Sequence, residues 1–377
     1  MNKRKFILLI IFPLLISLLL FVTDPVNAEA DMPLELSEVE HGLASGYYTM
    51  KDTEDKSVIM MTARIIHVGD EYITGKNIHY IVERVEGNTA WARSRGQIKL
   101  SDPPDVPGIF KSGMLPPAAQ GNNPPVTIGV FHSHGAEAYV PSDGTESIPE
   151  GGGILDVGKA FAAALEDKGL PVNHSTETHV PHDAGAYHRS RRTKEELMRQ
   201  NSDVFFDVHR DAVPAEQYTE IVEGKPTVQI QFVVGRQNQN LEVNRGFAES
   251  LKNVTDQLYP GLIKGIFMAR GNYNQDMTPL SLLLEVGSHE NTREGAEKSV
   301  ALFADAVNFY FAGPEGARAQ RTAGVTALRT VLWIILIALL AVGAYLLIST
   351  GSIEEARAKL RSFMEKEFAE FRGRLKR

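Results

Sequence analysis

The chain has 377 residues, a formal net charge of -8 and no cysteine. This length is sufficient for two domains with accessory segments. The negative charge argues against a nucleic-acid-binding protein, which usually carries a basic surface. Without cysteine the chain forms no disulfide and offers no thiolate, so any metal ion must be held by His and carboxylate side chains.

The first 28 residues have the pattern of a secretory signal. A basic start, Met1–Lys5, precedes an apolar run from Phe6 to Val22, and Val26-Asn27-Ala28 offers the small residues that a signal peptidase reads. We predict a cleaved signal peptide over residues 1–28. An uncleaved anchor is the alternative, because the apolar run is nearly long enough to span a bilayer. Both interpretations predict export.

Residues 33–101 are typical of a small β-rich domain. Apolar and β-branched runs at Val58–Ile66 and Ile78–Val82 are separated by Gly, Asn and Asp. Residues 102–125 contain three Pro-Pro pairs and little periodicity, and we interpret them as a linker.

Residues 126–312 alternate between strand and helix patterns. The expected strands are 126–131, 204–208, 228–234 and 281–284, and the expected helices are 155–168, 192–200, 242–258 and 293–311. This alternation predicts an α/β domain, with a mainly parallel twisted sheet and flanking helices. Ligands of such sheets bind at the carboxyl ends of the strands.

Three of these strands end in groups that can hold or use a metal ion. His134 and Glu137 follow the first strand, His209 ends the second and Glu285 ends the fourth. A hydrolytic zinc site needs three His or carboxylate ligands and a nearby carboxylate that takes a proton from water. We therefore predict that His134, Glu137 and His209 bind Zn²⁺ and that Glu285 is the general base.

Other polar residues surround this set. Glu150, beside a run of three glycines, is the alternative to Glu137 as the carboxylate ligand. His132 alternates with His134 along an extended chain, so only one of the two should face the metal ion. We expect His132 to point away from the ion and to support the residues that bind it. Arg210 and Asp211 are expected to steady the site or hold substrate carboxylates. A further group of histidines lies in a polar loop and is interpreted as solvated or at the rim of the site, with contact to the substrate as the alternative: His174, His179, His182 and His188.

A second apolar run, over residues 331–349, contains no charged residue. Because roughly 20 apolar residues cross a bilayer, we predict a transmembrane helix. The amphipathic segment 350–377 is rich in Lys and Arg, which favours the cytoplasmic side. The predicted location is the cell membrane, with the catalytic domain outside and the tail inside.

Three segments resemble the sporulation stage II protein P family, cell-wall amidases of endospore-forming bacteria. They are Phe131–His134 with Glu137-Ala138-Tyr139, Tyr187–Arg191, and Asp207–Ala212. The segment Leu284–Gly287 is similar to the equivalent piece of the broader zinc N-acetylmuramoyl-L-alanine amidase group. The resemblance spans about Val126 to Phe311, half of the chain.

This resemblance implies an amidase-like fold and cleavage of the bond between N-acetylmuramic acid and L-alanine in peptidoglycan. It also implies a second, endopeptidase activity at peptide cross-links, a role in engulfment, and two partners, sporulation stage II proteins D and M. Arg189 and Arg191 lie in the second matching segment, and we expect them to support the site or contact the substrate.

Two other functions stay open. A zinc carboxypeptidase-like peptidase that trims wall peptides also fits His134-x-x-Glu137 with a distant His. An inactive wall-binding membrane protein is the second alternative, and it need hold no zinc.

Overall fold

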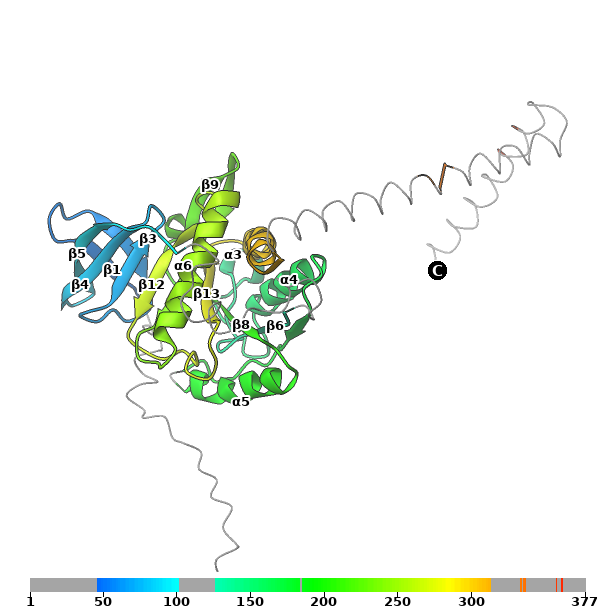
Figure 1. The fold of residues 1–377 in the computed structure, drawn as a ribbon, viewed down its shortest axis with the longest axis horizontal. Helices are drawn as coiled ribbons and strands as arrows, with labels where there is room; N and C mark the ends of the chain where they lie inside the picture. The colour runs from blue at the N-terminus through cyan, green and yellow to red at the C-terminus, as the bar shows by residue number, and fades with distance from the viewer. Residues whose placement is uncertain are drawn as a thin grey trace, which may run out of the picture.

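A sheet of eleven strands organises the chain in the computed structural model (Figure 1). The structure describes residues 46–101, 126–183 and 185–312, together with residues 333, 335, 336, 357 and 361. From one edge to the other the strands are β2 (Val58–Thr62), β1 (Tyr48–Asp52), β5 (Thr89–Gln97), β4 (Ile78–Glu86), β3 (Glu71–Thr74), β12 (Ile263–Ala269), β11 (Ile230–Gly235), β13 (Ser281–Ser288), β8 (Val204–Asp211), β6 (Ile128–Phe131) and β7 (Val172–His174).

The prediction of a mainly parallel sheet is only partly correct. β7, β6, β8 and β13 are parallel neighbours, but β11 runs antiparallel to β13, and most of the N-terminal strands are antiparallel. A parallel connection needs a long crossover, usually a helix. Between β8 and β11 the chain forms only a 3₁₀ turn, η3 (Ala215–Tyr218), and a hairpin of β9 (Thr219–Val222) and β10 (Lys225–Val228). The strand direction within the sheet therefore reverses between β13 and β11.

Three helices cover one face of the sheet. They are α4 (Ile154–Glu166), α6 (Leu241–Leu258) and the helical residues 293–312, and all three agree with the sequence prediction. The apolar core lies beneath them: the Phe161 ring of α4 and the Phe247 ring of α6 lie 5.4 and 6.1 Å from the ring of Phe206 on β8. Since residues alternate along β8, Phe206 and Val208 face this core and the residues between them face the opposite side.

The opposite face carries α5 (Ala186–Arg199) and the loops that follow the strands. This helix begins six residues before the predicted start at Arg192. Its buried side includes Ser190, Thr193 and Lys194, so its apolar periodicity is weak. β8 likewise runs three residues past its predicted end, because His209, Arg210 and Asp211 are polar but buried.

The strands predicted in residues 33–101 continue the sheet of residues 126–312. β3 pairs antiparallel with β12, and the Tyr72 hydroxyl donates a hydrogen bond of 3.1 Å to the Lys264 carbonyl. β12 is a strand that our sequence analysis does not predict, since Lys264 and Gly265 interrupt its apolar pattern. Figure 1 shows the N-terminal strands β1, β3, β4 and β5 on one side of β12 and β13, and β8 and β6 on the other.

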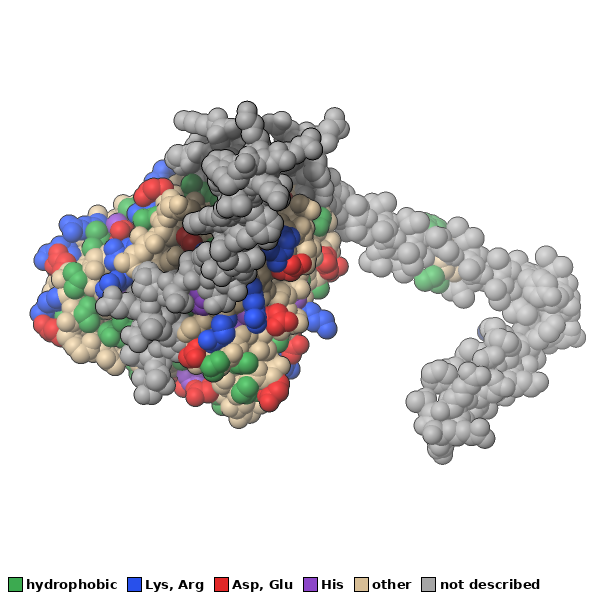
Figure 2. All heavy atoms as spheres, turned by 90° about the horizontal axis from the view of Figure 1, so that it is seen from below, with side chains coloured by type: hydrophobic (Ala, Val, Ile, Leu, Met, Phe, Trp, Pro, Cys, Tyr) green, Lys and Arg blue, Asp and Glu red, His purple; other side chains and the backbone are tan. Residues whose placement is uncertain are grey.

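Several predicted segments lie outside the described residues: the signal peptide 1–28, the linker 102–125, and nearly all of the span 331–349 and the tail 350–377. Within the part of the chain that is described, no helix combines the length and apolar character needed to cross a membrane. On the face shown in Figure 2, basic and acidic side chains of the described residues are interspersed.

Candidate metal centre

Three of the predicted site residues lie together in the structure. His134, Glu137 and His209 are buried, and each offers one ligand atom such that the three atoms lie within 4.8 Å of one another. The Glu137 Oε1 atom is 3.9 Å from the His134 Nδ1 atom and 3.6 Å from the His209 Nδ1 atom. Two imidazoles and one carboxylate are a ligand set that suits zinc and leaves a coordination position open.

The turn after β6 places His134 and Glu137 on the same side. The Glu137 amide donates to the His134 carbonyl, and the Gly152 amide donates to the Gly135 carbonyl. A Cβ atom added at Gly152 would lie 1.9 Å from the Glu137 carbonyl oxygen, so only glycine permits this approach. The glycine run therefore supports the turn that carries the ligands. The neighbouring Glu150 is exposed and is not part of the cluster.

One oxygen of Glu137 is held by the backbone of β8. Its Oε2 atom accepts a hydrogen bond of 2.9 Å from the Arg210 amide, which leaves Oε1 beside the two imidazoles. Burial raises the pKa of Glu137, but the positive charge of the neighbouring His209 outweighs burial. The pKa of Glu137 therefore lies below its ordinary value. Glu137 is therefore a carboxylate at neutral pH.

Asp207 orients His209 from the same face of β8. The His209 Nε2 atom is 2.9 Å from the Asp207 Oδ1 atom, which also accepts a hydrogen bond of 2.7 Å from the Ser133 amide. Burial lowers the pKa of His209, but Asp207 and then Glu137 outweigh this effect and raise it. Carboxylates commonly fix the orientation of metal-binding imidazoles in this way. Our sequence analysis gives Asp207 no role, although a spacing of two along a strand puts it beside His209.

Glu285 lies opposite His209, since the two residues are register partners in β13 and β8. Its Oε1 atom accepts a hydrogen bond of 2.6 Å from Arg64 Nε, and its buried Oε2 atom has no hydrogen-bond partner among the described residues. Burial raises the pKa of Glu285 above its ordinary value, although the guanidinium of Arg64 opposes the shift. One carboxylate oxygen is thus positioned and the other is available to take a proton.

Arg64 is a site residue that sequence reasoning missed. It follows β2 and is far from the other site residues in the sequence. Its Nη1 atom donates a hydrogen bond of 3.1 Å to the Tyr187 hydroxyl of α5. Tyr187 in turn has its ring centroid 5.0 Å from that of His134 and 6.0 Å from that of His209. No local motif around Arg64 indicates this role, because only the pairing of the sheet brings it to Glu285.

The interpretation of the loop histidines as solvated is wrong for His179. His179 is buried and lies between the His132 carbonyl and the Thr193 hydroxyl, at 2.7 Å from each. His182 is exposed, as expected, but its ring is stacked on that of His134, with ring centroids 4.5 Å apart. Arg189 explains this arrangement, because its guanidinium binds the His179 carbonyl and the Asp183 carboxylate and folds the loop over the end of β6.

His132 points away from the cluster, as the alternation along the chain predicts. Its Nδ1 atom lies 2.9 Å from the Val208 carbonyl and its Nε2 atom 3.1 Å from the His174 Nε2 atom. Burial lowers the pKa of His132 to about 3, so the ring is neutral. His132 thereby ties the ligand turn to β8.

The remaining predicted residues bind the loops around the cluster. Arg210 donates to the carbonyls of Ala138 and Glu146. Asp211 accepts hydrogen bonds from the Ala63 amide and the Tyr218 hydroxyl. Arg191 forms a two-pronged ion pair with Asp276, at 2.9 and 3.0 Å.

Comparisons with solved structures give low overall similarity. An N-acetylmuramoyl-L-alanine amidase from Clostridium difficile 630 is 15% identical, with a TM-score of 0.33 over 49% of this chain and 94% of that one. The CwlD amidase from Clostridioides difficile, solved in complex with the GerS lipoprotein, is 16% identical, with a TM-score of 0.33 over 52% of this chain and 99% of that one.

Sequence comparisons are more specific. Stage II sporulation protein P from Bacillus subtilis (strain 168) is 30% identical over 212 residues, which are 50% of this chain and 53% of the relative. The chain thus matches about half of the length of this curated relative. The family model described as "Stage II sporulation protein P (SpoIIP)" matches residues 54–308, which include Arg64 and the strands β2 to β5. Since this match covers more than half of the chain, it confirms the family resemblance, and the chain belongs to the Stage II sporulation protein P family.

Proposed function

We propose that this chain is a zinc-dependent peptidoglycan hydrolase that cleaves the amide bond between N-acetylmuramic acid and L-alanine. One observation carries the proposal: His134, Glu137 and His209 form a buried cluster, with Glu285 paired opposite His209. The choice of bond follows from the resemblance of the site segments to the amidases of this family. A further cut at peptide cross-links belongs to the same proposal.

The residues of the cluster fit a zinc ion. His134, Glu137 and His209 would hold it, because their donor atoms converge and their chemistry is that of hydrolytic zinc sites. When bound, zinc supplies Lewis acidity, which activates water and polarises a carbonyl group. Asp207 keeps the ring of His209 in place, as the short contact to its Nε2 atom indicates.

Glu285 would move the proton in this reaction. Its unpartnered Oε2 atom accepts a proton from water as the water oxygen bonds to the carbonyl carbon of the lactyl amide. The same proton then passes to the amide nitrogen as the carbon–nitrogen bond breaks. The products are a free carboxylate on the muramic acid and a free amine on L-alanine. Arg64 holds the Oε1 atom and so keeps Oε2 directed at the water.

Digestion of purified sacculi tests this function. We expect the chain to release intact stem peptides and leave denuded glycan strands, and to stop when a chelator removes the metal. Glu285→Gln should abolish release while the zinc content is retained, and Glu137→Gln should lose zinc as well. Glu150→Gln is the control, since Glu150 is exposed and lies outside the cluster. Full activity of the Glu285→Gln variant would refute the assigned role.

The same experiment separates the alternatives. A carboxypeptidase-like enzyme is compatible with the donor set, but it would trim the stems and leave them attached to the glycan. An inactive wall-binding protein would release nothing. Metal analysis of the purified chain then distinguishes a zinc enzyme with another substrate from a homologue without metal.

The cellular setting is a further part of the proposal. We place the matched region outside the cytoplasmic membrane, with residues 331–349 as the span, the tail 350–377 inside, and stage II proteins D and M as partners. The apolar run and the basic tail support this topology. A protease added to intact protoplasts should remove the outer region and spare an epitope on the tail; cleavage of the epitope would overturn the topology.

A further inference from the structure

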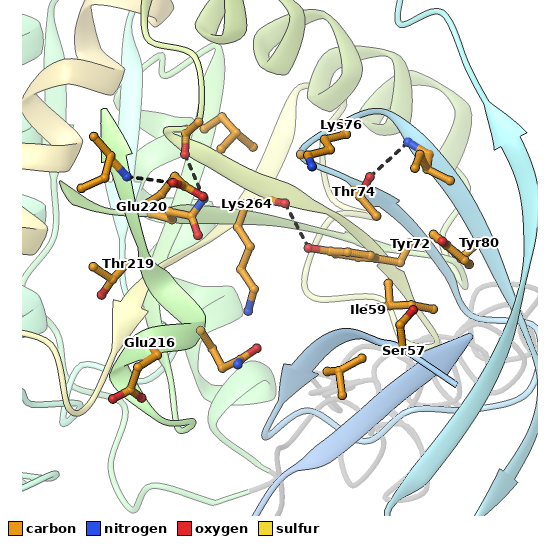
Figure 3. Close-up of a pocket in the computed structure, with 18 residues that line it drawn as sticks. Ser57, Ile59, Tyr72, Thr74, Lys76, Tyr80, Glu216, Thr219, Glu220 and Lys264 are labelled. Carbon is orange, nitrogen blue, oxygen red and sulfur yellow. Dashed lines mark hydrogen bonds between the residues drawn. The ribbon is translucent and has the colours of Figure 1, made fainter. Parts of the chain in front are cut away.

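A pocket of about 670 Å³ lies between the N-terminal strands and the hairpin of β9 and β10. Ile59 and Tyr72 line it from the N-terminal strands, Glu216 and Thr219 line it from η3 and β9, and Lys264 of β12 reaches between these walls (Figure 3). None of these residues belongs to the cluster described above. The pocket therefore joins two segments that are far apart in the sequence.

Lys264 lines the pocket, and its ammonium group forms no close ion pair with a described carboxylate, although the charges of Asp211 and Glu285 act on it. Its Nζ atom lies 3.3 Å from the Met61 carbonyl oxygen and 3.8 Å from the centre of the Tyr218 ring. An ammonium group can donate three hydrogen bonds. Burial lowers the pKa of Lys264 to about 8, so the charged form predominates at neutral pH. A carboxylate placed in the pocket would give this cation a partner.

Charges of opposite sign occupy opposite sides of the rim. Lys76, beside β3, lies on one side, while Glu216 and Glu220 lie on the other (Figure 3). The exposed side chain of Ile221 adds an apolar surface next to Glu220. A ligand that carries both a carboxylate and an ammonium group would match the opposite charges of the two sides. A short peptide carries both groups.

A chain of contacts links Lys264 to the strand that carries His209. The Tyr218 ring lies beneath the Lys264 cation, and the Tyr218 hydroxyl donates a hydrogen bond of 3.0 Å to the Asp211 Oδ2 atom. Asp211 lies two residues after His209 on β8, on the same face of the sheet. The pocket and the candidate metal centre are thus connected through Tyr218 and Asp211.

We propose that this pocket is a binding site for a zwitterionic peptide, whose free carboxylate pairs with Lys264 and Lys76 and whose ammonium group faces Glu216 and Glu220. The identification of that peptide as the stem peptide of the wall rests on the function proposed above. In this arrangement the N-terminal strands select the substrate, and the loops after β6, β8 and β13 cut it.

Direct binding of a sugar-free peptide to the full chain tests the site. The probe is L-alanyl-γ-D-glutamyl-L-lysine, which contains no muramoyl bond. The control is its analogue with both carboxylates converted to carboxamides, which keeps both ammonium groups. Calorimetry should show that the chain binds the acid form at least ~10-fold more tightly than the analogue. Lys264→Met should remove this difference, and Lys76→Met should reduce it. Lys225→Met is the matched control, since Lys225 is exposed on β10 and does not line the pocket.

A second pair of variants covers the case in which Lys264→Met does not fold. Ile221 is 57% exposed at the rim beside Glu220, so Ile221→Lys adds a positive charge where the ammonium group of the peptide would lie, and Ile221→Gln is its neutral counterpart. The first should weaken binding of the acid form severalfold and the second should not. Equal affinity of the two peptides for the unmodified chain, or an unchanged preference in Lys264→Met together with an unchanged affinity in Ile221→Lys, overturns the site.

The two proposals fail separately. If the chain digests sacculi but does not bind the tripeptide, the pocket proposal is wrong and the hydrolase proposal stands. If the tripeptide binds in a Lys264-dependent way while sacculi stay intact, the pocket is a peptide site and the hydrolase proposal is wrong.

Discussion

The Glu285 Oε1 atom lies 2.6 Å from the Arg64 Nε atom, although the two residues are 221 positions apart in the chain. This contact ties the N-terminal strands to the candidate metal centre. Both side chains are buried, with 7% of the Arg64 side chain and 2% of the Glu285 side chain exposed, so the ion pair is shielded from solvent. The N-terminal strands therefore belong to the site.

Loss of Arg64 should impair Glu285 without removing the metal. In Arg64→Met the guanidinium no longer opposes the rise in the pKa of Glu285, so the carboxylate form should need a higher pH. We expect turnover to fall about 10- to 100-fold, the size typical of groups that support metal sites, and the acid side of the pH profile to move upward. Arg84→Met, at an exposed ion pair with Glu86, is the control. An unchanged pH profile would show that Arg64 does not act through Glu285.

Asp207 should control the affinity for zinc. Asp207→Asn removes the negative charge next to His209 and weakens the contact that orients its ring. Partners of this kind are worth about 10- to 100-fold in metal affinity. Competition with a chelator measures the zinc dissociation constant, and Asp167→Asn, at an exposed position after α4, serves as the control. Equal affinities of the two variants would contradict the role of Asp207.

The glycine run should be needed for the ligand turn. In Gly152→Ala the new Cβ atom would meet the Glu137 carbonyl, so either the turn or α4 must move. We expect a destabilisation of about 1–3 kcal/mol, together with loss of zinc. Gly224→Ala separates the clash from the conformational cost, because Gly224 has a positive φ but nothing within 4 Å of the added atom. Denaturant unfolding compares the two, and a larger effect at Gly224 would count against the interpretation.

The three residues of the cluster were predictable because of their positions at strand ends. His134 and Glu137 are separated by a single turn, and His209 continues a buried strand, so short-range patterns brought them to the same edge of the sheet. Their convergence follows from the rule that parallel strands present their carboxyl ends together. Glu285 follows from the same rule, because β13 is parallel to β8.

The rest depends on contacts between distant segments. Arg64 reaches Glu285 only because β3 pairs with β12 and extends the sheet. His182 reaches His134 because Arg189 folds its loop, which is a set of hydrogen bonds without a periodic signal. β12 was missed because its apolar residues are interrupted by Lys264 and Gly265, and these are the residues that contact Tyr72. Long-range pairing of this kind leaves little trace in a local pattern.

Lys194 should make the stability of the chain depend on pH. Its Nζ atom is buried against the sheet and donates to the Asn274 carbonyl at 2.6 Å and the Ser281 hydroxyl at 2.8 Å. Burial lowers the pKa of Lys194 to about 7, whereas an unfolded lysine titrates near 10.4. Between these values the unfolded state binds more protons than the folded state, so this group makes the free energy of unfolding rise with pH.

Lys194→Met should remove this contribution. The difference in unfolding free energy between the unmodified chain and the variant should therefore grow from pH 7 to pH 10, with a limiting slope of about 1.4 kcal/mol per pH unit. Urea unfolding at several pH values measures it, and Lys225→Met, at an exposed position, should show no such trend. A constant difference across this range would mean that Lys194 stays charged in the folded protein. The hydrogen bonds to Asn274 and Ser281 would then compensate fully for its burial.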